Sequence, residues 1–149
     1  MSVAGAWRGA LATCAADIVA DQATKQAVVT ELAGRLPIEL PLGFELDYVT
    51  NTGIAFGLLD QGEALVIVIT LAALALLVAW FARDPERPGL WPAVGLLSGG
   101  ALGNLADRVR DGPVIDFLDP PNWPAFNLAD VAITFGVALL LIAYWRTAE

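Results

Sequence analysis

Histidine is absent from the 149-residue sequence, and cysteine occurs once, at Cys14. The absence of histidine excludes a serine–histidine triad, a cysteine–histidine dyad and a zinc site of the His-Glu-x-x-His type, because each depends on imidazole as base or ligand. A single cysteine excludes an intramolecular disulfide and a cluster of thiolate metal ligands. The sequence predicts neither a bound metal nor another cofactor.

Basic residues are also scarce. Lys and Arg together number 8 against 16 acidic residues, and the formal net charge is −8. Nucleic-acid binding requires clustered Lys and Arg to neutralise phosphates, and here the basic residues are scattered. The composition therefore argues against nucleic acid as a partner. The excess of acids is assigned to site carboxylates and to loops that face water.

Apolar residues, in contrast, make up 57% of the chain, more than soluble domains usually contain. The uncharged run over residues 64–82 reaches about 20 residues with its edges, enough to span a hydrocarbon core of roughly 30 Å. Further neutral runs cover residues 89–106 and 131–145. The sequence predicts an all-α membrane protein with a small extramembrane β element, as a single polytopic domain over residues 1–149. Its four transmembrane helices are expected at about 6–28, 63–81, 90–107 and 128–145.

The first of these helices carries two acids, Asp17 and Asp21, in a segment otherwise rich in Ala, Val, Leu and Ile. Their four-residue spacing puts both on one helical face, so they can point into a bundle while the other face meets lipid. A cleaved signal peptide is the alternative, since residues 11–14 resemble a lipoprotein cleavage box. Thr13 is larger than the residue preferred there, and Arg8 leaves almost no apolar stretch before it, so a retained helix is favoured.

Two segments outside the helices differ in character. Residues 31–62 contain prolines and a glycine followed by residues 44–49, where apolar and acidic residues alternate with the period of a half-exposed strand. This segment is expected to form the extramembrane β element. Residues 110–126 contain four prolines, so they cannot form one regular helix and are expected to be a second outer loop.

Four spans place both termini on one side of the membrane and both extramembrane segments on the other. The positive-inside rule barely separates the two orientations, because four basic residues, Arg146 among them, lie on the terminal side and four on the opposite side. If Lys25 and Arg108 serve a functional site and are left out, four basic residues remain on the terminal side and two on the opposite side. This count favours cytoplasmic termini.

Polar residues gather over residues 98–130, between two strongly apolar segments. Asp116 is a lone carboxylate in the apolar run of residues 114–118, and Asp130 lies at the start of the fourth helix. Two carboxylates in a low-dielectric site do not easily both ionise, so one keeps a proton and the pair offers an acid and a base together. Such a pair suits peptide hydrolysis, with the base activating water and the acid assisting the oxyanion and the leaving amine.

These polar residues also have purely structural interpretations. Asn127, with Asp130 three residues later, resembles a helix N-cap followed by an acid that the helix dipole favours. Asp107 and Arg108 are consistent with a charge pair at a helix end, and Lys25 with a lysine that extends to the membrane interface. Spacing alone leaves both the structural and the catalytic interpretations open.

Five motifs, in order and over nearly the whole chain, resemble those of the lipoprotein signal peptidases, also called type II signal peptidases. The matching segments are residues 21–25 (DQATK), 51–57 (NTGIAFG), 99–108 (GGALGNLADR), 114–117 (VIDF) and 126–130 (FNLAD). Any one of these motifs can arise by chance, whereas five in sequence are highly specific.

The resemblance implies a four-helix aspartyl endopeptidase of the bacterial cytoplasmic (inner) membrane, functional as a monomer, with cytoplasmic termini and an active site toward the outer face. Its partners would be membrane lipid and its substrates, diacylglyceryl-modified prolipoproteins, which it would cut just before the lipidated cysteine. By match to the motifs, Asp116 and Asp130 are the catalytic dyad. The residues expected to orient the substrate and the dyad, or to support the site, are Asn51, Asn104, Arg108, Asn127, Asp21 and Lys25.

The chain departs from the family pattern at Val131, where a small polar residue is common, and Asp17 is an additional acid without a family role. Two competing interpretations differ in their predictions. Other intramembrane proteases would show histidines or a GxGD motif, which the sequence lacks. A small ion or proton transporter would distribute acids through the depth of several helices, whereas the acids at 107, 116 and 130 are expected to cluster toward one membrane face.

Overall fold

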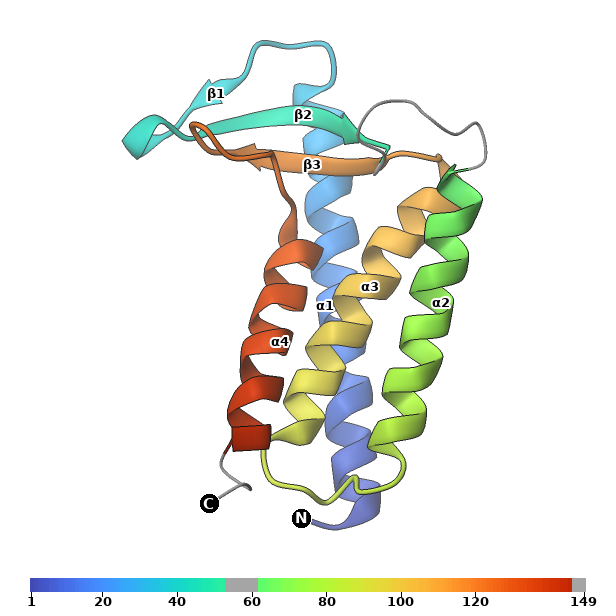
Figure 1. Cartoon of the computed structure of the whole chain (residues 1–149). Coiled ribbons are helices and arrows are strands. Elements are labelled where there is room, and N and C mark those ends of the chain that lie inside the picture. Colours follow the sequence, from blue (N-terminus) through green and yellow to red (C-terminus); the bar gives the residue numbers. More distant parts are fainter. Residues whose placement is uncertain (53–61, 146–149) are drawn as a thin grey trace.

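The structure is a computed structural model that describes residues 1–52 and 62–145 of the chain. In this part of the chain, four helices stand side by side and a small sheet covers one end of the bundle (Figure 1). The helices are α1 (Val3–Leu32), α2 (Gly62–Phe81), α3 (Leu90–Arg110) and α4 (Leu128–Trp145). The N-terminus and the end of α4 lie together at the end opposite the sheet. The protein is therefore mostly helical, as its apolar runs predict.

Two helices are longer than their apolar runs indicated. α1 begins at Val3, where the Ser2 hydroxyl accepts a hydrogen bond from the Gly5 amide at 3.2 Å, and it continues to Leu32. α3 continues to Arg110 instead of ending near residue 107, and its last turn is closed by the Asp111 amide, which donates to the Asp107 carbonyl. Arg108 and Arg110 thus belong to the helix and not to the following loop.

The sheet has three antiparallel strands in the order β1 (Ile38–Glu39), β2 (Glu45–Asn51) and β3 (Val114–Asp119). β2 confirms the strand expected from the alternation of residues 44–49. Within the second outer loop expected over residues 110–126, residues 114–119 form β3 and pair with β2, placing Val49 opposite Asp116. The four prolines lie outside this strand, so none removes a donor from the ladder.

Residues 53–61, which belong to the expected β element and include residues 53–57 of the second motif, lie outside the described residues, as does Arg146. Within the described part of the expected β element, β1 and β2 are its strands. Because Asp116 lies on β3 and Asn51 ends β2, the sheet carries polar residues of two separate motifs to the same place.

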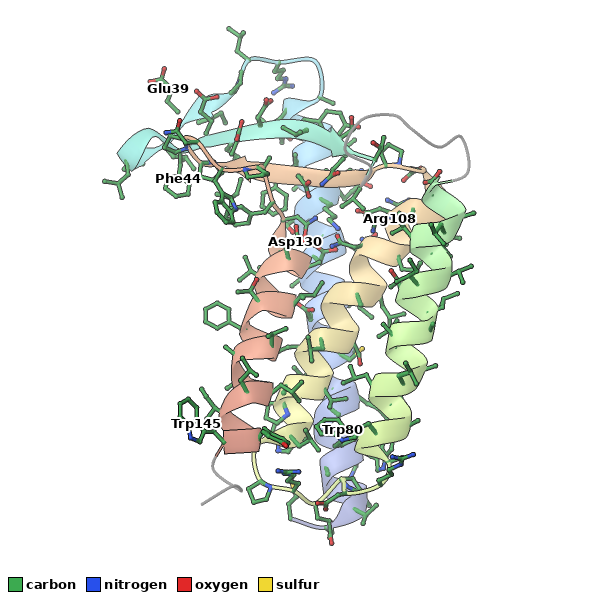
Figure 2. The ribbon with its side chains drawn as sticks, in the orientation of Figure 1. Glu39, Phe44, Trp80, Arg108, Asp130 and Trp145 are labelled. Atoms are coloured by element: carbon green, nitrogen blue, oxygen red, sulfur yellow. The ribbon has the colours of Figure 1, made fainter. Side chains whose placement is uncertain are left out.

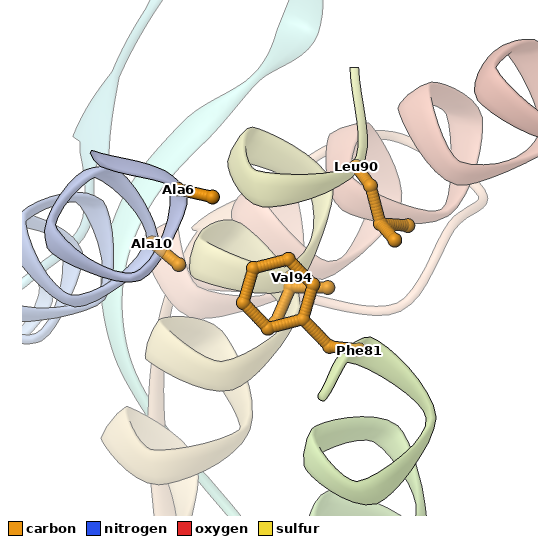
Figure 3. Close-up of a cluster of buried hydrophobic side chains, with 5 residues drawn as sticks. All are labelled: Ala6, Ala10, Phe81, Leu90 and Val94. Atoms are coloured by element: carbon orange, nitrogen blue, oxygen red, sulfur yellow. The ribbon is translucent and has the colours of Figure 1, made fainter. Parts of the chain in front are cut away.

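Two hydrophobic clusters hold the helices and the sheet together. At the terminal end of the bundle, five buried side chains from α1, α2 and α3 meet: Ala6, Ala10, Phe81, Leu90 and Val94 (Figure 3). At the other end, Val28 and Leu32 of α1 pack against Ile115 and Phe117 of β3. The second cluster fixes the strand that carries Asp116 on the extended end of α1.

The outward surface of the helices is strongly apolar. On α2, Val68 and Leu76 are largely exposed, and on α4 the same holds for Phe135 and Leu141. Two helices in the described part of the chain, Glu63–Phe81 and Leu128–Trp145, are long and apolar enough to cross a membrane. Polar groups are instead buried between the helices, which is the arrangement expected of a protein surrounded by lipid.

Close approach between α3 and α4 depends on Gly100. A Cβ atom at this position would collide with the carbonyl oxygen of Ala129, in the first turn of α4. We expect Gly100→Val to push α4 away from α3 and to destabilise the fold by at least roughly 1–3 kcal/mol, the usual cost of overpacking. Thermal unfolding in detergent measures this loss. Ala101→Val, which points into an apolar groove beside α3, is the matched control and should change the melting temperature little.

Candidate active site

The two candidate catalytic carboxylates lie at the sheet end of the bundle. Asp116 is on β3 and only 1% exposed, whereas Asp130 is half-buried in the first turn of α4. Figure 2 shows Asp130 where α4 reaches the underside of the sheet. Strand and helix thus bring the fourth and fifth sequence motifs to one place.

Asn127 connects the two carboxylates. Its side-chain Nδ2 donates a hydrogen bond to Asp116 Oδ1 at 2.7 Å, and its Oδ1 accepts one from the Asp130 amide at 3.0 Å. In return, the Asn127 amide donates to Asp130 Oδ2 at 3.2 Å. This reciprocal pair is a capping box at the start of α4. The capping and site interpretations of Asn127 and Asp130 are therefore compatible, because one amide side chain serves both.

Two further asparagines donate to the pair from other elements. Asn51, at the end of β2, donates through Nδ2 to Asp116 Oδ2 at 2.9 Å. Asn104 of α3 donates through Nδ2 to Asp130 Oδ1 at 2.9 Å. Each carboxylate thus receives a nitrogen donor on both of its oxygens. Such donors hold the carboxylates in fixed orientations and favour their ionised forms.

Burial opposes this preference at Asp116. Loss of solvent is the largest influence and raises the pKa of the Asp116 carboxyl, the negative charge of Asp130 raises it as well, and the hydrogen bonds from Asn51 and Asn127 lower it. The net result is a pKa above the ordinary aspartate value. Asp116 therefore keeps its proton to higher pH than a solvent-exposed aspartate does.

A buried ion cluster lies directly beside the asparagines. Lys25 is 1% exposed, and its Nζ lies 2.8 Å from Asp21 Oδ2 and 2.8 Å from Asp107 Oδ2. The same ammonium donates to Asn104 Oδ1 at 2.9 Å. The interpretation of Lys25 as an interface lysine is therefore wrong. Both carboxylates are fully buried, and the ammonium is what compensates their charge.

This cluster touches the elements that carry the dyad. Asp21 Oδ1 accepts a hydrogen bond from the Ala129 amide at 3.0 Å, in the first turn of α4. Asp107 Oδ2 accepts one from the Ile115 amide at 3.3 Å, next to Asp116. Since an ammonium can only donate, Lys25 also requires Asn104 to present its oxygen to the lysine and its nitrogen to Asp130.

Sequence reasoning missed Asp107 and Gln22 as parts of the site. The sequence is consistent with a charge pair between Asp107 and Arg108. In the structure Asp107 instead pairs with Lys25 and accepts a hydrogen bond from Gln22 Nε2 at 2.8 Å. Gln22 also donates to the Gly103 carbonyl at 3.2 Å. The available signal was helical spacing, because Asp107 lies three residues after Asn104 and so shares its face.

The resemblance implied that Arg108 orients the substrate or the dyad, but the hydrogen bond of its guanidinium is to a backbone carbonyl. It is half-buried near the end of α3 (Figure 2), and its guanidinium donates to the carbonyl of Asn104 at 3.4 Å.

Asp17 lies one turn before Asp21 against Gly99, and its buried Oδ2 has no hydrogen-bond partner among the described residues. Within residues 1–52 and 62–145, no three His, Cys, Asp or Glu side chains are arranged to hold a metal ion.

An apolar exterior around a buried polar centre is typical of a membrane protein. The model of the family described as signal peptidase (SPase) II matches residues 13–146. The chain belongs to this family of proteases.

Individual relatives agree with this assignment over most of their length. The chain is 46% identical over 135 residues to the lipoprotein signal peptidase of Pelotomaculum thermopropionicum, covering 89% of this chain and 88% of the relative. It is 45% identical over 139 residues to that of Syntrophotalea carbinolica, covering 87% and 86%. A solved structure described as a bacterial membrane enzyme superposes with a TM-score of 0.82 at 32% identity, covering 91% of each chain.

Proposed function

We propose that this protein is an aspartyl endopeptidase that removes the signal peptide from diacylglyceryl-modified prolipoproteins, cutting just before the lipidated cysteine. The observation that carries the proposal is the pair Asp116 and Asp130, because Asn127 forms hydrogen bonds with both residues. The names of the relatives support the substrate class, since they are lipoprotein signal peptidases.

Asp116 is the protonated member of the pair in this mechanism, because its buried carboxyl has the raised pKa. Asp130 accepts a proton from water as the water oxygen attacks the scissile carbonyl carbon, and Asp116 donates its proton to the carbonyl oxygen. When the tetrahedral intermediate collapses, the C–N bond breaks and the leaving nitrogen takes the proton from Asp130, while Asp116 recovers its own. Asn51, Asn104 and Asn127 hold both carboxylates in orientation during these steps.

The proposed topology has four transmembrane helices in the bacterial cytoplasmic (inner) membrane. The helices contain 30, 20, 21 and 18 residues. At 1.5 Å per residue they are about 27–45 Å long, which suits a hydrocarbon core of roughly 30 Å. The charges of α1 and α3 at Asp21, Lys25 and Asp107 are buried between helices and so avoid lipid.

The orientation proposed places the termini in the cytoplasm and the sheet, with the dyad below it, at the outer face. Trp80 and Trp145 lie near the terminal end of the bundle (Figure 2), while the exposed Trp123 belongs to the segment at the sheet end. Tryptophan is common at membrane interfaces, so these residues mark two boundaries of the span. The protein is proposed to act as a monomer in contact with lipid.

The test is cleavage of a purified diacylglyceryl-modified prolipoprotein by the detergent-solubilised protein, beside the same prolipoprotein without lipid. We expect cleavage before the lipidated cysteine and none of the unlipidated substrate. Intact lipidated substrate in the presence of a folded preparation would remove the proposed activity. Equal cleavage of both substrates would leave a peptidase but remove the lipid requirement.

The pKa of Asp116 gives a prediction for pH. Because the reaction requires Asp116 in its protonated form, the rate falls as pH rises through this pKa. The Asn51 hydrogen bond lowers the pKa of Asp116, so Asn51→Ala should raise it further and move the alkaline limb of the pH–rate profile to higher pH. Steady-state rates across pH measure the shift. Gln26→Ala, at an exposed amide on α1, should leave the limb in place, and a limb that moves downward in Asn51→Ala would contradict the assignment of the proton.

A further inference from the structure

Asp130 lines a groove on the outside of the bundle. The groove has a volume of about 370 Å³, and its other lining residues are Trp123, Phe126, Val131, Thr134 and Phe135. Trp123 is 70% exposed and Phe135 is 62% exposed, so the groove opens on the lipid-facing surface of α4. It leads from a candidate catalytic carboxylate directly to the hydrocarbon.

The lining of the groove is apolar except at its inner end. The Thr134 hydroxyl donates to the carbonyl oxygen of Asp130 at 2.8 Å, so its hydrogen is already engaged by the helix. The remaining walls are two phenylalanines, a tryptophan and the Val131 side chain. An occupant of this groove must therefore be apolar along its length and reactive only where it meets Asp130.

We propose that this groove receives an acyl chain of the diacylglyceryl group on the substrate cysteine. The inference rests on the proposed function, which places that cysteine immediately after the scissile bond. Its glyceryl group must then lie within one residue of the dyad, and its acyl chains must leave the site toward lipid from that point. The groove beside Asp130 supplies such a path, and Val131 makes its wall more apolar at the position next to the carboxylate.

A helical signal peptide is a poorer occupant. A helix about 10 Å across with a pitch of 5.4 Å fills roughly 400 Å³ or more in each turn. At about 370 Å³ the groove is smaller than one turn of helix, whereas an extended acyl chain is far narrower and can lie partly in the groove and continue into the surrounding lipid.

A second apolar groove is the rival site for the lipid. It has a volume of about 270 Å³ and lies between α2, α3 and α4. Its lining residues are Ile69, Thr70, Ala73, Leu74, Leu77, Leu97, Ala101 and Ile133. None of these is a catalytic candidate, so a chain seated there would have to reach the dyad from a greater distance along the bundle.

The effect of the groove should appear as selectivity for chain length. Lipid tails are as apolar as the groove, so moving a chain into it gains packing contacts and little hydrophobic free energy. Filling the groove should accordingly harm a long-chain substrate and spare one whose chains are too short to occupy it.

The experiment compares two lipopeptides, one with a dipalmitoylglyceryl and one with a dibutyrylglyceryl cysteine, and measures kcat/KM for each. Thr134→Phe fills the groove one turn below Asp130 and should lower kcat/KM for the dipalmitoyl substrate about tenfold, the usual scale of an overpacking penalty. The dibutyryl substrate should change little. Thr134→Val removes the hydroxyl without adding bulk, and Ala73→Phe places the same phenyl side chain in the rival groove; both should preserve the wild-type ratio of the two substrates.

Equal losses for both substrates in Thr134→Phe would overturn the acyl site, because a general disturbance of Asp130 would then explain them. A ratio lowered by Ala73→Phe and unchanged by Thr134→Phe would also overturn it and assign the lipid to the rival groove. If the wild-type protein cleaves neither lipopeptide, the proposed function itself fails, and that result differs from the first two.

Discussion

Asp116→Asn and Asp130→Asn should each reduce cleavage of the lipidated substrate by about 10⁴-fold or more, the scale on which loss of one member of a catalytic unit acts. In Asp116→Asn the pair loses the carboxyl that donates a proton to the carbonyl oxygen. In Asp130→Asn it loses the base that accepts the water proton. Either amide preserves shape and accepts one of the two hydrogen bonds through its oxygen, while its NH2 group faces the second donor, so the fold should remain intact with a modest loss of stability.

The measurement is single-turnover cleavage, with thermal unfolding recorded for each variant. Asp111→Asn is the matched control, since this acid is exposed and pairs with Arg110 at 2.6 Å, away from the asparagines of the site. It should cleave at the wild-type rate. Substantial activity in a folded Asp116→Asn or Asp130→Asn would remove that residue from the dyad. A large loss in Asp111→Asn would show that the assay reports general disturbance.

The helices were predictable because hydrocarbon thickness sets a length that few sequences reach by chance. The uncharged run that became α2 is an example, and its end is marked by the proline-containing turn before α3. β3 was not predictable in the same way. Its six residues lie between Pro113 and Pro120, and the density of prolines around them favours an irregular loop unless the pairing partner in β2 is known.

The structure brings the candidate site residues together, but the spacing along the chain does not give the role of each. Asn127 and Asp130 have the spacing of a capping box, and the same spacing serves a catalytic carboxylate, so no pattern along the chain separates the two roles. Only the hydrogen bond from Asn127 Nδ2 to Asp116, which lies on another element, connects the cap to the second carboxylate. Lys25 is similar, because its burial depends on Asp107, which lies far along the chain on α3.

Lys25→Met should destabilise the protein by about 3–5 kcal/mol, because it leaves the fully buried carboxylates of Asp21 and Asp107 without their shared ammonium. Methionine fills a similar volume, so the loss reports charge and not a cavity. Equilibrium unfolding in mixed micelles measures it. Arg35→Met removes the cation of an exposed pair with Glu31 at 3.4 Å and is the matched control, for which little change is expected.

Combining Lys25→Met with neutral substitutions of Asp21 and Asp107 tests whether the cluster only stabilises the fold or also positions Asn104. The triple variant Asp21→Asn, Lys25→Met, Asp107→Asn carries no buried charge at the cluster, and its amide oxygens can still accept from the Ala129 and Ile115 amides, so stability should largely return. Activity should return only in part, because Asn104 Oδ1 keeps the hydrogen bond from Asn127 Nδ2 at 3.0 Å but loses the one from Lys25, so the nitrogen that faces Asp130 is held less firmly. Full activity in the triple variant would show that the cluster only stabilises the fold. Wild-type stability in Lys25→Met alone would show that the two buried acids do not both carry charge.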